Sequence, residues 1–131
     1  MGKDLLHLYG ETDGAATTGD FSMSCDLIYG TFIDFRLPVG AKLKVWTKRI
    51  AGKAVTVLMK MTEDITADTP SWSVLGRDYL ASDGELSIEK QKPLILQSIT
   101  GKEAVRFSWE QPTAGVSSVE LEMEIDTNGR E

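Results

Sequence analysis

The chain has 131 residues, of which 41% are hydrophobic and 26% are charged. This length and composition predict a single globular domain over residues 1–131, and they exclude a disordered or collagen-like chain. The formal net charge of −6 argues against a nucleic-acid partner, because phosphate backbones are bound mainly by clustered Lys and Arg. A single cysteine, Cys25, excludes a disulfide within the chain.

The sequence carries no sign of a membrane partner. No apolar run approaches the roughly 20 residues that a membrane-spanning helix requires, and the first residues do not open the pattern of a signal peptide. Leu6 stands where a myristoylation signal after Gly2 carries Ser or Thr. We therefore expect a protein that is made in the cytoplasm without a signal peptide.

Alternation of apolar and polar residues predicts a series of short strands. Residues 5–9 fit either one helical turn or an opening strand, and residues 65–79 have no clear period. Along the chain, the alternating stretches are 21–27, 42–45, 55–62, 85–89, 94–96, 105–110 and 118–125. In the last of these, apolar side chains alternate with polar ones, as a sheet with one solvated face requires.

Turn signals separate these stretches. Asp83–Gly84 and Gly101 favour tight hairpins, and a turn at residues 112–115 is expected to join the strands on either side of it as a hairpin. Short strands with turns about every 8–12 residues are typical of β-sandwiches and β-barrels. The sequence therefore predicts an all-β fold, an antiparallel β-sandwich, with a jelly roll of about eight strands favoured. An immunoglobulin-type sandwich is the alternative, although this chain lacks the disulfide of that fold.

The sequence contains few candidate catalytic residues. His7 is the sole imidazole, so a Ser–His–acid set has one available base, and no Gly-x-Ser-x-Gly turn accompanies it. One imidazole also excludes the multi-histidine metal sites of cupin-like enzymes. Cys25 alternates with apolar residues, as a core cysteine does. We therefore expect that the protein is not an enzyme, has no catalytic or metal-ligating residues and needs no cofactor.

Two acidic patterns favour a structural interpretation. Residues 126–129 look like part of a calcium loop but lack its later ligands, so a solvated tail is expected, while calcium at the loop aspartates stays an open question. Glu120, Glu122 and Glu124 are spaced like the acidic row of certain jelly-roll glycosidases. No aromatic residue accompanies them, so we expect a plain solvated strand face.

Two tryptophans and two lysines are the candidate contact residues. Trp46 falls in the register of Lys44 and Lys48, opposite the apolar positions of the same stretch, so its indole is expected to face outward. Trp72 lies in a Pro-containing loop. An exposed tryptophan can stack on a sugar, sit in a subunit interface or be covered by a loop of its own chain. The predicted interface or ligand-binding residues are therefore Trp46, Trp72, Lys44 and Lys48.

Two functions remain open. The first is a noncatalytic structural or assembly protein, such as a virion decoration (cement) or minor capsid-type subunit, which joins copies of itself, as in a trimer, or a larger protein assembly. The lysines around Trp46 are then expected to meet the glutamate row of a second copy, so that association weakens as salt rises. The alternative is a carbohydrate-binding β-sandwich module whose aromatic residues stack on a glycan. The sequence favours assembly, because secreted sugar-binding modules usually bring a signal peptide, disulfides or an attached enzyme.

Overall fold

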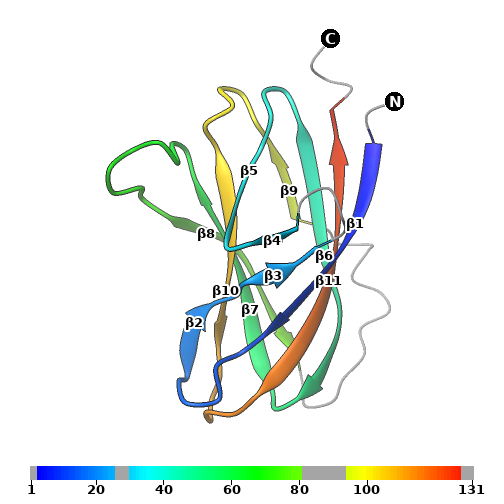
Figure 1. The fold of residues 1–131 in the computed structure, drawn as a ribbon, viewed down its shortest axis with the longest axis vertical. Coiled ribbons are helices and arrows are strands. Elements are labelled where there is room, and N and C mark those ends of the chain that lie inside the picture. Colours follow the sequence, from blue (N-terminus) through cyan, green and yellow to red (C-terminus); the bar gives the residue numbers. More distant parts are fainter. Residues whose placement is uncertain (1–2, 26–29, 81–93, 128–131) are drawn as a thin grey trace.

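The computed structural model describes residues 3–25, 30–80 and 94–127, and all the regular elements among them are β-strands. The strands form two antiparallel sheets that pack face to face (Figure 1). The predicted all-β antiparallel sandwich is therefore confirmed. No helix in the described ranges is long and apolar enough to cross a membrane.

A six-stranded sheet carries both the first and the last described strand. Its hydrogen-bonded order is β4 (Thr31–Phe32), β3 (Met23–Ser24), β1 (Lys3–Glu11), β11 (Ser117–Asp126), β6 (Lys42–Gly52) and β9 (Leu94–Gln97). β11 lies between β1 and β6 and pairs with both of them along almost all of its residues. This central strand and its two neighbours form the platform on which most of the predicted contact residues lie.

A five-stranded sheet covers the inner face of the first sheet. Its path is β2 (Thr18–Asp20), β10 (Ala104–Glu110), β7 (Val55–Thr62) and β8 (Ser73–Leu80), and β5 (Asp34–Arg36) also pairs with β10. β7 pairs with one edge of β10, while the short strands β2 and β5 share its other edge. Each of these short strands therefore depends on β10 for its backbone hydrogen bonds within the sheet.

β11 follows the predicted alternation along its whole length. Its buried residues are Ser117, Val119, Leu121, Met123 and Ile125, and each residue between them is half-buried. Successive side chains of a strand point to opposite faces of the sheet. The apolar row therefore enters the core and the glutamates lie on the outer face, which confirms the predicted sheet with one solvated face at this strand.

Consecutive strands often belong to different sheets. Val105, Phe107 and Trp109 of β10 pack in one core cluster with the apolar row of β11, as alternation predicts. However, β10 lies in the five-stranded sheet and β11 in the six-stranded one. Residues 111–116 therefore cross the sandwich, and the predicted hairpin is wrong. Gly101 likewise lies in a crossing, from β9 to β10, because turn residues mark where a chain reverses but not which sheet the next strand joins.

Several local expectations have different outcomes. Residues 5–9 belong to β1, so the strand alternative is correct there. Of the described part of the stretch 21–27, which ends at residue 25, Met23–Ser24 forms a strand, and Phe21 is also fully buried. β8 occupies the second half of the aperiodic stretch. The predicted strand 85–89 and the Asp83–Gly84 turn lie outside the described residues.

Candidate functional site

Trp46 is buried, which corrects the expectation of an exposed indole. It lies opposite Glu122 in the β6–β11 register, so its side chain is directed to the outer face of the six-stranded sheet as predicted. Only 6% of the residue is exposed, and its Nε1 donates a hydrogen bond to Glu122 Oε1 at 2.8 Å. Alternation gives the direction of a side chain but not what packs over it. Trp46 therefore cannot serve as an open platform for a ligand in this conformation.

Glu122 is the centre of a polar cluster on the same face. His7 Nδ1 lies 3.3 Å from Glu122 Oε2, and Lys48 Nζ lies 3.9 Å from Glu122 Oε1. The carboxylate thus contacts the imidazole of β1 and both the indole and the ammonium of β6. These groups hold the carboxylate from both neighbouring strands, so Lys48 is engaged within its own molecule.

The other members of the acidic row also face basic residues of the adjacent strand. Arg49 Nε lies 3.0 Å from Glu120 Oε1, and Lys44 stands opposite Glu124 in the register. The basic row of β6 and the acidic row of β11 are therefore neighbours on one face of one molecule. Glu120 and Glu122 thus have basic partners within their own molecule, while the expected meeting of the two rows across two copies stays a prediction.

Trp72 is half-buried on the other sheet, beside Arg106 of β10. The Arg106 Cζ atom lies 4.2 Å from the centroid of the Trp72 ring, a cation–π contact. Arg106 Nε and Nη2 also donate to the two carboxylate oxygens of Asp34 at 2.7 and 3.0 Å. The hydrogen bond with Asp34 raises the pKa of Arg106 above its ordinary value. The guanidinium thus takes up part of the ring surface that a ligand would use.

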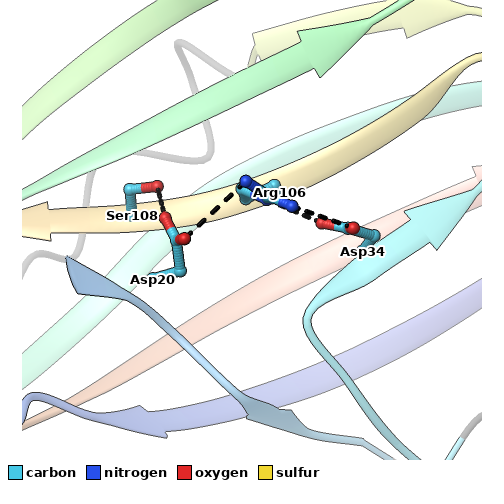
Figure 2. A network of polar contacts seen from close by, with 4 residues as sticks. All are labelled: Asp20, Asp34, Arg106 and Ser108. Carbon is cyan, nitrogen blue, oxygen red and sulfur yellow. Dashed lines mark hydrogen bonds and ion pairs between the residues drawn. The ribbon is translucent and has the colours of Figure 1, made fainter. Parts of the chain in front are cut away.

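The network around Arg106 extends to a second aspartate (Figure 2). Arg106 Nη1 lies 3.7 Å from Asp20 Oδ2, and the Ser108 hydroxyl donates to Asp20 Oδ1 at 2.5 Å. Asp20 belongs to β2 and Asp34 to β5, whereas the two partners belong to β10. The network therefore fastens the two short strands to β10, and we name it the β10 clamp.

The remaining candidate groups are dispersed. Cys25 is half-buried and packs against the core cluster. His7 lies on the six-stranded sheet, away from the Ser108–Asp20 pair of the other sheet. Among the described residues, no three His, Cys, Asp or Glu side chains are grouped so that they could hold a metal ion. Residues 128 and 129 of the suspected calcium loop lie outside the described ranges.

A hollow of about 960 Å³ lies on the outer face of the six-stranded sheet and was not predicted. One row of its lining crosses four paired strands and consists of Ser24, Tyr9, Glu120 and Arg49. Small side chains follow in its floor, namely Ser22, Ser118 and Ala51. We call this surface the Tyr9 hollow. Alternation in the sequence predicts that these serines face outward. It does not predict that they lie close together, because that depends on which strands are neighbours in the sheet.

Exposed apolar side chains stand on the neighbouring strands β8 and β9. Within the described residues, β8 pairs only with β7 and β9 only with β6. A Cβ atom placed on Gly76 of β8 would lie 2.6 Å from Leu94 Cδ1 of β9, so the two strands are in close contact across the sheets. Apolar side chains between 39% and 62% exposed stand on these strands, namely Val74, Leu75, Tyr79 and Ile95. We call this surface the β8–β9 edge.

Comparison with known proteins supports the fold. No family model matches the chain, and no curated protein matches it. Among solved structures, murine APRIL, a TNF-like jelly roll, is similar with a TM-score of 0.61 and 9% identity, over 93% of this chain and 98% of that chain. At this identity the likeness extends to the jelly-roll β-sandwich alone.

Two bacterial structures are similar at lower TM-scores. The Yersinia pseudotuberculosis-derived mitogen has a TM-score of 0.44 and 9% identity, over 95% of this chain and 86% of its own. The K3 adhesin domain of Lys-gingipain from Porphyromonas gingivalis has a TM-score of 0.46 and 12% identity, over 90% of this chain and 91% of its own. These likenesses carry no conclusion about function.

Proposed function

We propose that this protein is a noncatalytic assembly subunit that joins copies of itself, or a larger protein assembly, through the β8–β9 edge. The observation that carries the proposal is that β8 and β9, each paired on one side only among the described residues, both expose apolar side chains. Edge strands present backbone groups that can pair with another chain, and large exposed apolar side chains are candidates for protein contacts. The partner is therefore a protein surface of matching apolar character.

The placement of the reactive side chains supports a noncatalytic role. His7 is held against Glu122 on one sheet, while the Ser108 hydroxyl is bonded to Asp20 on the other. A nucleophile and its base must lie within hydrogen-bond reach of each other. His7→Ala is accordingly expected to leave the function of the protein intact.

In its finer form, the proposal is a virion decoration (cement) or minor capsid-type subunit, acting as a homo-oligomer such as a trimer. A subunit of this kind needs a rigid fold and a contact surface rather than a reaction centre. The two packed sheets supply the rigid fold, and the β8–β9 edge supplies the contact surface. Trp46 and Trp72 are no longer needed for the contact, because both are partly or wholly covered within the molecule.

The test is the mass of the protein in solution, measured by light scattering during size-exclusion chromatography. We expect the wild type to be heavier than one chain, and Val74→Lys combined with Ile95→Lys to reduce it to one chain, because two buried ammonium groups would oppose the contact. The control combines Ile33→Lys with Val116→Lys, two exposed apolar positions outside the edge strands. It should keep the mass of the wild type.

Two results would contradict the proposed contact between copies. A wild type that stays a single chain up to its highest soluble concentration would remove the homo-oligomer. Equal dissociation of the control and the edge variant would show that the contact does not lie on the β8–β9 edge.

A further inference from the structure

The Tyr9 hollow is separate from the β8–β9 edge, because β1, β3 and β11 lie on the far side of β6 from β9. From Ser24 on β3 to Arg49 on β6 the hollow spans three strand spacings, which is about 14 Å. Sites for small ligands have volumes of about 300–1,000 Å³, and the volume of the hollow, about 960 Å³, falls within that range. Its dimensions suit a ligand larger than a metabolite fragment and smaller than a protein domain.

Tyr9 supplies an aromatic surface in this hollow. The residue is 50% exposed and stands between Ser24 on β3 and Glu120 on β11. A tyrosine ring offers an apolar face and a polar hydroxyl at its end. A pyranose ring is complementary to both, since its C–H groups point from the faces of the ring and its hydroxyls from the rim.

Polar groups surround the ring on the side toward β6. Arg49 Nε lies 3.0 Å from Glu120 Oε1, and the Ser118 hydroxyl donates to Glu11 Oε2 at 3.1 Å. A guanidinium carries five N–H donors and a carboxylate accepts through two oxygens, so each pair keeps capacity for a ligand. Adjacent fixed donors and acceptors match the neighbouring hydroxyls of a sugar, each of which both donates and accepts.

The charge of the lining decides the class of glycan. Among the described residues, its charged side chains are Glu11, Glu120 and Arg49, with a net charge of −1. A carboxylate in excess repels anionic ligands, so sulfated and uronic-acid glycans are disfavoured. We infer that the Tyr9 hollow binds a short neutral oligosaccharide, with the Tyr9 ring stacked on one sugar. This inference does not rest on the proposed assembly function.

The test begins with a glycan array probed with the intact wild-type protein. The neutral oligosaccharide that gives the strongest signal is then titrated calorimetrically into two variants. Tyr9→Ala removes the ring, whereas Ala51→Leu fills the floor and leaves the ring in place. We expect each change to weaken binding per site by about tenfold or more, and anionic glycans to bind the wild type more weakly than neutral ones.

Two controls separate the hollow from the rest of the surface. Leu5→Ala removes an exposed side chain of the same strand outside the lining, and Tyr79→Ala removes an exposed ring at the β8–β9 edge. Both should bind like the wild type. The inference is overturned if no neutral oligosaccharide binds at millimolar concentration, or if a control loses as much affinity as Tyr9→Ala. It is also overturned if Tyr9→Ala changes the mass of the assembly, which would make the hollow a protein contact.

Discussion

Glu103 shows how one buried carboxylate fixes a turn between the two sheets. It accepts hydrogen bonds from the Ser98 hydroxyl at 2.8 Å, from Ile99 N at 3.0 Å and from Gly101 N at 3.1 Å. Burial acts to raise the pKa of this carboxyl, but the hydrogen bonds from Ile99 N and the Ser98 hydroxyl outweigh it and lower the pKa to about 2. The turn therefore depends on an ionised side chain in a buried place.

This arrangement predicts a stability that depends on pH. The folded pKa of about 2 lies below the ordinary value of 4.5, so the contribution is fully present above pH 4.5 or so and is lost as pH falls through the folded pKa. We expect Glu103→Gln to lower the unfolding free energy by about 3 kcal/mol near neutral pH. Urea unfolding measures the difference in unfolding free energy between wild type and variant. This difference should narrow steadily as pH falls from about 5, where protonation begins, to about 2. A gap that stays constant over this range would assign the effect to shape rather than to charge.

At the scale of the elements, the β10 clamp holds two strands that are too short to be stable alone. β2 and β5 have three residues each, and isolated short strands are marginal in water. Arg106 has 24% of its side chain exposed and contacts both aspartates, whereas Arg49 is 61% exposed in its pair with Glu120. Removal of the first guanidinium leaves two partly buried carboxylates without their partner.

Arg106→Met is expected to lower the unfolding free energy by about 2–3 kcal/mol. Arg49→Met is the matched control and should cost less than about 1 kcal/mol, because exposed ion pairs contribute little. Urea unfolding measures both values, and hydrogen exchange of the amides in β2 and β5 should accelerate only in the first variant. Equal losses in the two variants would show that the clamp is an ordinary surface contact.

The sequence predicts the elements better than it predicts their neighbours. Alternation identifies the buried face of β11 and of β10, because the direction of a side chain in a strand is a local property. Alternation does not predict that these strands lie in opposite sheets, because the turn residues between them are compatible either with a hairpin or with a connection that crosses to the other sheet. Trp46 is missed for a related reason, since its burial depends on what packs over it and not on its own strand.

The candidate site could be predicted only in part. Lys44 and Lys48 do lie on the outer face, but the glutamate opposite Lys44 in the register and the glutamate paired with Lys48 come from β11, far along the chain. The contact between Trp72 and Arg106 and the gathering of small residues below Tyr9 are also non-local. To predict each of these features, one must know the order of strands in a sheet, and the alternation of apolar and polar residues carries no information about that order.

At the scale of the whole molecule, several ionic contacts on the outer face of the six-stranded sheet form within one copy. The acidic row of β11 is flanked by His7 of β1 and by the basic row of β6. The chain as a whole carries a net charge of −6, so two copies repel each other at long range. In the proposed assembly, attraction between copies is therefore expected to come from apolar side chains such as those of the β8–β9 edge.

The dependence of association on salt follows from this arrangement. An increase from about 0.1 M to about 1 M salt shortens the screening length from about 10 Å to about 3 Å. Screening weakens the repulsion between two negatively charged copies, while an apolar contact does not weaken with it. We therefore expect the mass of the wild-type assembly, measured by sedimentation or light scattering, to be maintained or to increase over this range. Dissociation at high salt would instead mean that the contact is ionic, and the lysine and glutamate rows would again be its best candidates.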